Sequence, residues 1–310
     1  MIIEFTDDLK RQDIYANGIE LVQILGMDTD SHGNRITTRP DSEKKLLTSI
    51  NNPVLITDNY RIGLLDSIAR DTVFALYSGF VKKIIYNNTS MEFEQRKYPG
   101  VWGPSIDTIL LCKSLKYLKD TNQLDDVNYA AEIGSGSGFI SKYILEHNSQ
   151  IKQMDLVDIS PLAIQCAKDN IFDSRMNAIK TTGGNYLSSK KLDLIVSNPP
   201  YIPRITTVEN NPYEGIGLLS SLITLGKKSL TNDGMLILNM SNLCENNALK
   251  LIKAENLKYE KIDSLDVPLK ILRILNNPEW FNYLKNNSVS KKINDGYAFW
   301  QTINVYKISK

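Results

Sequence analysis

From residue 126 onward, short apolar segments alternate with longer segments of helical periodicity. The apolar segments cover 127–133, 154–158, 192–197 and 235–240, and apolar residues recur every three to four positions between them. Strands that alternate with helices form a parallel sheet, because each helix returns the chain to the same end of the sheet. Helices then cover both faces, which suits strands that are apolar throughout. The pattern therefore predicts an α/β fold built on a mostly parallel, doubly wound sheet.

The sequence predicts two domains with a boundary near residue 98. Residues 1–98 mix short helical patterns, at 46–50 and 62–74, with a hairpin-like pattern over 81–96. They predict a smaller α+β domain for substrate recognition, followed by a larger domain over 99–310. Within the larger domain, two last strands are expected at 259–265 and 298–308. Residues 267–295 between them predict a helical insertion.

Composition excludes several classes of protein. Lys and Arg total 36 and Asp and Glu total 35 of 310 residues, a net charge of +1. This balance argues against nucleic-acid binding through bulk positive charge. Only two histidines, His32 and His147, are present, which disfavours a histidine-based metal site or a Ser-His-Asp triad. Three widely spaced cysteines, no long apolar run and no signal-peptide layout predict a cytoplasmic protein without metal or membrane.

A glycine loop, Glu132-Ile-Gly-Ser-Gly-Ser-Gly138, follows the first of these strands and precedes a helix. Gly134, Gly136 and Gly138 allow a tight turn and let a ligand approach the backbone closely. Asp158 lies at the end of the next strand, where a carboxylate accepts hydrogen bonds from ribose hydroxyls in a doubly wound sheet. The combination predicts a nucleoside-cofactor site.

The surrounding residues indicate which cofactor this is. The loop lacks the G-x-G-x-x-G spacing of dinucleotide sites and the G-K-[ST] of phosphate loops. A carboxylate at Glu132 opposes a diphosphate but suits a cationic ligand, such as the sulfonium and ammonium of S-adenosylmethionine. Ser135 and Ile159 are further candidate contacts beside the loop and Asp158. The alternative is that the glycines serve packing alone. That alternative does not explain why acidic residues stand both at Glu132, two positions before the first glycine, and at Asp158, at the end of the next strand.

A second motif, Asn198-Pro199-Pro200-Tyr201, ends the strand at 192–197. The two prolines lock the backbone and remove two N–H donors. The Asn198 side-chain carbonyl and the Pro199 backbone carbonyl remain as aimed acceptors, and Tyr201 adds a flat face. These groups suit a planar amide or amino group, whose nitrogen is a weak nucleophile. Catalysis then rests on positioning and on acceptors that strengthen as the N–H becomes acidic, with no histidine base.

Residues 95–265 resemble class I S-adenosylmethionine-dependent methyltransferases with an Asn-Pro-Pro-Tyr motif, and in particular the release-factor glutamine N5-methyltransferases. The resemblance is carried by EIGSGSG, LVDISPLAIQCAKDN and LDLIVSNPPYIP. It implies a Rossmann-like sheet whose last strand is antiparallel. It also implies that Asn198 and the adjoining proline carbonyl hold the target nitrogen beside Tyr201. The segment GPSIDT resembles the loop that closes over the methionine end, which implies that Asp107 and Thr108 lie near the cofactor.

The chain departs from this family in three places. Where the family often has an acidic residue that touches the adenine amine, this chain has Gly184-Asn185-Tyr186, and Asn185 would accept as a neutral group. Tyr186 and Asn198 are further candidate cofactor contacts. Residues 1–95 do not match the helical N-terminal domain of the release-factor enzymes, and the insertion after Val267 is unusual. Because such appendages select the substrate, the acceptor stays open.

Three functions follow from these observations. The first is methyl transfer to a protein glutamine, with a translation release factor as a possible partner. The alternative is methylation of an RNA or DNA base amino group, adenine N6 or guanine N2, because these groups are planar as well. The third is a non-catalytic methyltransferase fold used as a binding module.

Lys113, Lys116 and Lys119 share one helical face, which is either solvated or in contact with RNA phosphates.

Overall fold

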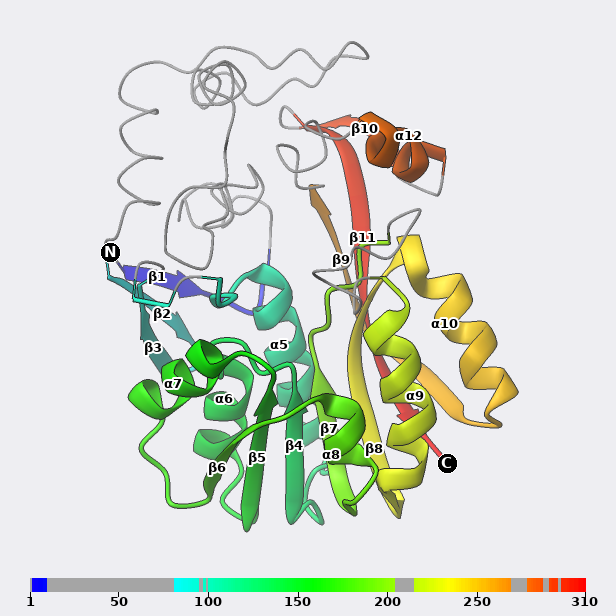
Figure 1. Ribbon diagram of the computed structural model, residues 1–310. Coiled ribbons are helices and arrows are strands. Elements are labelled where there is room, and N and C mark those ends of the chain that lie inside the picture. Colours follow the sequence, from blue (N-terminus) through cyan, green and yellow to red (C-terminus); the bar gives the residue numbers. More distant parts are fainter. Residues whose placement is uncertain are drawn as a thin grey trace.

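The computed structural model describes residues 2–9, 81–94, 97–98, 100–203, 215–268, 278–286, 290–294 and 297–310. The helical patterns predicted at 46–50 and 62–74 lie outside these residues. Figure 1 shows the arrangement of the elements.

The described strands are β1 (Ile2–Phe5), β2 (Lys82–Tyr86), β3 (Thr89–Phe93), β4 (Tyr129–Ile133), β5 (Gln153–Asp158), β6 (Met176–Lys180), β7 (Leu192–Ser197), β8 (Leu230–Ser241), β9 (Lys258–Pro268), β10 (Ser290–Asn294) and β11 (Tyr297–Ser309). The described helices are α5 (Ile106–Asp120), α6 (Phe139–His147), α7 (Pro161–Asn170), α8 (Gly183–Leu187), α9 (Gly217–Ser229), α10 (Asn242–Ala254) and α12 (Pro278–Asn286). In this described part of the chain, no helix is both long and apolar enough to cross a membrane.

The large sheet follows the order β10-β11-β8-β7-β4-β5-β6 in the described residues, and β9 pairs with β11 as well. The central strand β4 pairs in parallel with β5 on one side and with β7 on the other. The pairs β5–β6 and β7–β8 are also parallel, whereas β11 runs antiparallel to β8, β9 and β10. The predicted Rossmann-like sheet with an antiparallel last strand is confirmed.

Some local boundaries differ from the sequence-based expectations. The edge strand β6 was not predicted, because its residues are only partly buried or exposed and form no apolar run. Within the predicted hairpin, the turn is the pair Asn87 and Asn88, both with positive φ, and β3 begins at Thr89. The insertion is not purely helical, since β10 follows α12 and pairs with β11.

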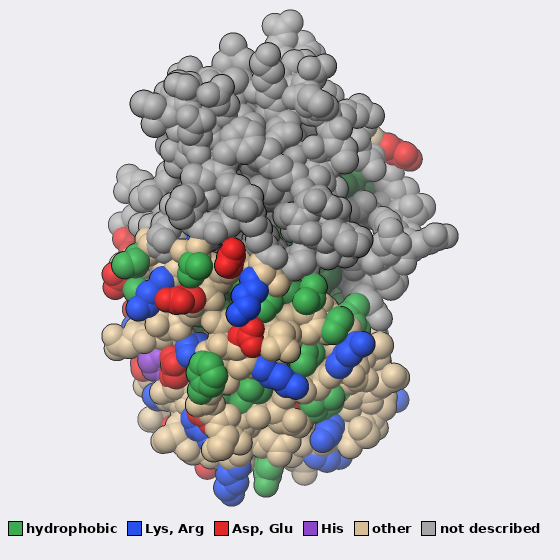
Figure 2. Space-filling view, turned by 60° about the vertical axis from the view of Figure 1, so that its left-hand side comes forward, with side chains coloured by type: hydrophobic (Ala, Val, Ile, Leu, Met, Phe, Trp, Pro, Cys, Tyr) green, Lys and Arg blue, Asp and Glu red, His purple; other side chains and the backbone are tan. Residues whose placement is uncertain are grey.

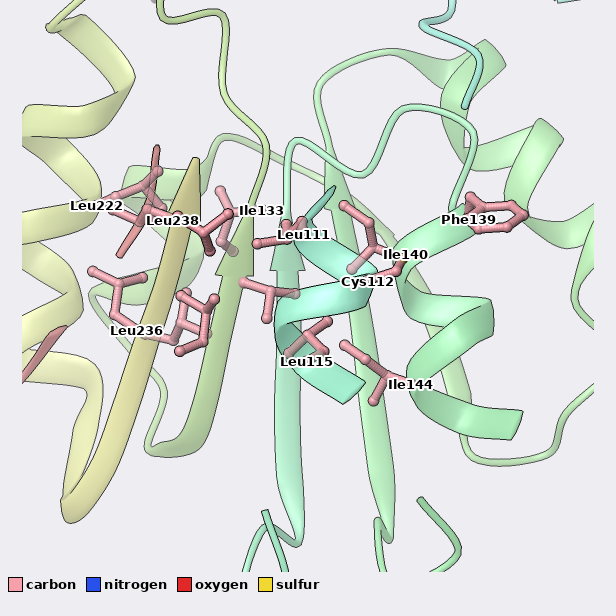
Figure 3. Close-up of a cluster of buried hydrophobic side chains, with 14 of the residues drawn as sticks. Leu111, Cys112, Leu115, Ile133, Phe139, Ile140, Ile144, Leu222, Leu236 and Leu238 are labelled. Atoms are coloured by element: carbon pink, nitrogen blue, oxygen red, sulfur yellow. The ribbon is translucent and has the colours of Figure 1, made fainter. Parts of the chain in front are cut away.

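Helices cover both faces of the large sheet. Leu236 and Leu238 are two positions apart in β8 and therefore point to the same face of the sheet. This is the face that α9 covers, where Leu222 lies beside them (Figure 3). Leu111 and Leu115 of α5 lie beside residues of α6 in the same cluster (Figure 3). All of these side chains are buried, so the core is formed by contacts between the helices and the sheet.

The small sheet β1-β2-β3 is attached to the large one through α5 and α6. Tyr86 donates a hydrogen bond to Asp7 (2.8 Å), and Asn87 Nδ2 donates to the hydroxyl of Tyr143 in α6 (3.0 Å). The Tyr86 and Tyr143 rings lie 5.7 Å apart, and Asp7 also pairs with Lys116 of α5. The described residues of the two sheets therefore share one continuous core.

Gly138, which begins α6, is required by packing. Its φ is +82°, and an added Cβ would lie 3.1 Å from Ile171 Cδ1 and 3.2 Å from both Ala167 and Leu156. Gly138→Ala is therefore expected to lower the free energy of unfolding by about 1–3 kcal/mol more than Gly100→Ala. Gly100 has a similar φ of +75°, but no atom of the described residues lies within 4 Å of the added Cβ. Urea denaturation of both variants measures the difference, and equal losses would contradict the packing explanation.

Candidate active site

The carboxyl ends of the parallel strands gather the predicted site residues at one edge of the sheet (Figure 1). The glycine loop follows β4, Asp158 ends β5, and Asn198 follows β7. Hydrogen bonds connect these ends: the Ser197 hydroxyl donates to the Ile133 carbonyl (2.6 Å), and the Gly134 N–H donates to the Val157 carbonyl (2.8 Å). Both motifs found in the sequence therefore belong to one site.

Asp158 is held against the glycine loop. Its carboxylate accepts the Gly136 N–H (2.9 Å) and the Ser160 N–H (2.8 Å), and the Ile159 N–H contributes a third backbone bond. Burial raises the pKa of Asp158, and these N–H donors oppose the rise. A carboxylate offers about four acceptor positions, so capacity remains for a ribose hydroxyl. The geometry fits the expected nucleoside contact.

The other loop residues divide into exposed and enclosed positions. Gly134 is exposed, and among the described residues only Leu218 comes within 4 Å of an added Cβ there. The Trp102 carbonyl accepts the Ser137 N–H (3.1 Å) and lies 3.1 Å from an added Cβ at Gly136. The hydroxyl of Ser135 is buried and has no hydrogen-bond partner among the described residues. An open glycine and an unpaired hydroxyl beside Asp158 fit a bound cofactor, whereas Gly138 serves packing.

Glu132 lies beneath the loop and is not an open anion. Its carboxylate accepts the backbone N–H of Ser141 (2.9 Å) and the Ser141 hydroxyl. Burial raises the pKa of Glu132 to about 8, so the carboxyl is mostly protonated at neutral pH. The role of Glu132 as a cofactor ligand stays a prediction, and its partner Ser141 was not foreseen.

Asp107 joins the first helix of the domain to the Asn-Pro-Pro-Tyr segment. One carboxylate oxygen accepts Asn198 Nδ2 (3.1 Å) and the Tyr201 hydroxyl (2.7 Å). The other accepts the Thr108 N–H (3.1 Å) and the Ser105 hydroxyl. These four donors fill the acceptor positions of the carboxylate, about four in all. A cofactor contact at Asp107 would have to displace one of them.

Thr108, also predicted beside the cofactor, is a buried residue in the first turn of α5. Its hydroxyl accepts the Ser105 N–H (3.2 Å). This bond satisfies one of the backbone donors near the start of the helix. Its role in helix capping is visible in the structure, and its role at the cofactor stays a prediction.

The Asn-Pro-Pro-Tyr segment is anchored beyond its own residues. The Pro200 carbonyl accepts the Gly215 N–H (2.7 Å), and the Pro203 carbonyl accepts Trp280 Nε1 from α12 (2.8 Å). Pro199 and Tyr201 are buried, while Asn198 is half-buried. The insertion therefore supports the predicted catalytic segment, a link that the sequence did not indicate.

The residues predicted to lie near the cofactor on the adenine side differ in their exposure. Asn185 is exposed at the start of α8, and Ile159 is 51% exposed after β5. Tyr186 is buried instead, and its hydroxyl donates to Asp155 (2.6 Å), away from open surface. Burial raises the pKa of Tyr186 above its ordinary range. Asn185 and Ile159 are thus accessible to a ligand, whereas the side chain of Tyr186 is part of the core.

The fold and the glycine loop beside Asp158 define an S-adenosylmethionine-dependent methyltransferase. The family model "Methyltransferase small domain" matches residues 108–262, which are 155 of the 310 residues. The chain belongs to this family, and S-adenosylmethionine is its methyl donor.

Three relatives show the range of acceptors among similar proteins. The ribosomal protein uL3 glutamine methyltransferase of Francisella tularensis is 31% identical over 39% of this chain and 44% of its own length. A putative protein N5-glutamine methyltransferase of Methanocaldococcus jannaschii is 28% identical over 58% of this chain and 92% of its own. A tRNA1(Val) (adenine(37)-N6)-methyltransferase of a Flavobacteriaceae bacterium is 30% identical over 29% of this chain and 38% of its own. The chain thus spans less than half of the first and third relatives.

The raised pKa of Glu132 predicts a pH-dependent stability. Between the ordinary value of 4.5 and about 8, the folded protein keeps a proton that the unfolded chain has lost. This contribution is complete at low pH and is lost as pH rises through that window. Glu132→Gln lacks it, so the Tm of the variant minus that of the wild type should grow from pH 5 to pH 8. Thermal unfolding measures this difference. Glu146→Gln, on the exposed side of α6, is the control, and a pH-independent difference for Glu132→Gln would contradict the assignment.

Proposed function

We propose that this methyltransferase acts on the side-chain amide nitrogen of a protein glutamine. The observation that carries the proposal is the orientation of the Asn198 amide. Its Nδ2 is engaged by Asp107, which leaves Oδ1 as the group that can accept an N–H from a substrate. Two acceptors of this kind, Asn198 Oδ1 and the Pro199 carbonyl, suit a planar –NH2 group with two donors.

When bound, S-adenosylmethionine supplies an electrophilic methyl group. Asp158 would hold a ribose hydroxyl, with Gly134 leaving room for the cofactor at the loop. Asn198 Oδ1 and the Pro199 carbonyl would each accept one amide N–H, and Tyr201 would border the amide plane. Positioning then supplies much of the rate acceleration. The two acceptors bind more strongly as the nitrogen gains positive charge, which stabilises the transition state.

The charge pattern of α5 supports a protein acceptor over a nucleic-acid base. In α5, Lys113 pairs with Asp263 (3.0 Å), and Lys116 pairs with Asp7. Figure 2 shows basic side chains interspersed with acidic and apolar ones on the described part of one face. The predicted lysine face of α5 is therefore partly neutralised by its own neighbours.

The acceptor class can be tested with methyl-tritiated S-adenosylmethionine and an extract from cells that lack the gene. Label that enters protein and appears as N5-methylglutamine after enzymatic digestion supports the proposal, and a release factor is then the first protein to examine. Label in RNA or DNA would assign a base amino group instead. An absence of label in every fraction, with cofactor binding measured separately, would contradict both acceptor classes.

Asn198→Ala should abolish transfer while preserving cofactor binding. Loss of an acceptor that acts mainly in the transition state is expected to lower kcat by roughly 10²–10³-fold. The Kd for S-adenosylmethionine, measured by calorimetry, should stay within about threefold because binding relies on Asp158 and the loop. An unchanged kcat would refute the assigned role of Asn198.

Asp158→Ala should have the opposite effect. Each hydrogen bond from a ribose hydroxyl to the carboxylate is expected to contribute about 1.5–3 kcal/mol, so cofactor affinity should fall by at least tenfold. Calorimetric titration with S-adenosylhomocysteine measures this loss without turnover. Unchanged affinity would show that the ribose lies elsewhere.

A further inference from the structure

Asn239 interrupts an apolar run near the C-terminal end of β8. The flanking residues Leu238 and Met240 are fully buried, and Asn239 is fully buried as well. Ser197 pairs with Leu238 in the parallel β7–β8 register, so the next position along each strand places Asn239 beside Asn198. A polar side chain thus lies inside the sheet directly next to the predicted catalytic segment.

The Asn239 amide has a defined orientation. Its Nδ2 donates to Asn198 Oδ1 (2.9 Å) and to the Asp107 backbone carbonyl (2.8 Å). Its own Oδ1 is buried and accepts no hydrogen bond from the described residues. A flipped Asn239 would set its oxygen against two acceptors and lose both bonds, so the observed orientation is the favourable one.

Asn239 and Asp107 together fix the orientation of Asn198. Asn239 offers a donor to Asn198 Oδ1, and Asp107 offers an acceptor to Asn198 Nδ2 (3.1 Å). If the Asn198 amide flipped, its NH2 would face the Asn239 donor and its oxygen would face the carboxylate. Both neighbours therefore reject the orientation that would present a donor to a substrate N–H.

We propose that Asn239 is a positioning residue that keeps Asn198 Oδ1 available as the acceptor for the target nitrogen. The inference rests on the proposed function, in which Asn198 holds that nitrogen. The buried Oδ1 of Asn239, which has no partner in the described residues, costs about 1–3 kcal/mol, and the two bonds that its Nδ2 donates return a similar amount. Stability alone thus does not explain an asparagine here, whereas the orientation of Asn198 does.

The test compares Asn239→Leu, which keeps the number and branching of the side-chain heavy atoms but removes the donors, with a matched control. Asn148 is also buried, its Nδ2 donates to a backbone carbonyl, that of Ile144 (2.9 Å), and its Oδ1 has no partner in the described residues. It lies at the end of α6, away from the site, so Asn148→Leu controls for the loss of a buried amide. Should Asn239→Leu fail to fold, Asn239→Ala replaces it. For each variant, kcat is measured with the extract fraction that takes up label in the experiment described under the proposed function. The Kd for S-adenosylmethionine and the Tm are measured on the purified variant.

Asn239→Leu is expected to lower kcat by roughly 10–100-fold, because a misoriented acceptor costs this much in positioned catalysis. Its Kd for S-adenosylmethionine should match that of the wild type, and its Tm should fall no further than that of Asn148→Leu. Asn148→Leu itself should keep the wild-type kcat. Unchanged kcat in Asn239→Leu, with Asn198→Ala inactive, would overturn the positioning role alone. A parallel fall of kcat, cofactor affinity and Tm would also overturn it, in favour of a purely structural role. If Asn198→Ala stays active, the proposed function fails first.

Discussion

The parallel pairing of β4 with β5 on one side and β7 on the other brings together the glycine loop, Asp158 and the Asn-Pro-Pro-Tyr segment. Strands that run in the same direction end at the same edge, so the glycine loop, Asp158 and Asn198 meet although they are distant in sequence. Helices on both faces bury these strands and hold their ends in place. The hydrogen bond from Ser197 to the Ile133 carbonyl then links the acceptor side of the site to the cofactor side.

The second constraint is the contact between α5 and the end of β7. Asp107, in the first turn of α5, binds both Asn198 and Tyr201, and the positive end of a helix dipole favours a carboxylate at this position. Asn239 completes the arrangement from the neighbouring strand. The predicted catalytic segment is therefore held by groups from α5, β8 and α12, and its prolines account for only part of its rigidity.

Much of this fold was predictable because the central strands are apolar. In addition, Ser160-Pro161 and the glycine loop mark the starts of the helices that follow them. Ser160 caps α7 as its sequence suggests, accepting the Ala163 N–H (3.3 Å). The half-exposed β6 and the strand β10 were not predicted, because neither shows an apolar run that distinguishes a strand. The links through Asp107 and Asn239 depend on which strands are neighbours, and a motif read along the chain does not contain that information. An asparagine inside the apolar run of β8 was the one local sign of the second link.

The most direct test of this account is a crystal structure of the chain with S-adenosylhomocysteine. We expect a ribose hydroxyl to donate to the Asp158 carboxylate and the sulfur to face Asn198, with the Asn198 amide still held by Asn239. A cofactor whose ribose lies away from Asp158, or whose sulfur points away from Asn198, would contradict it.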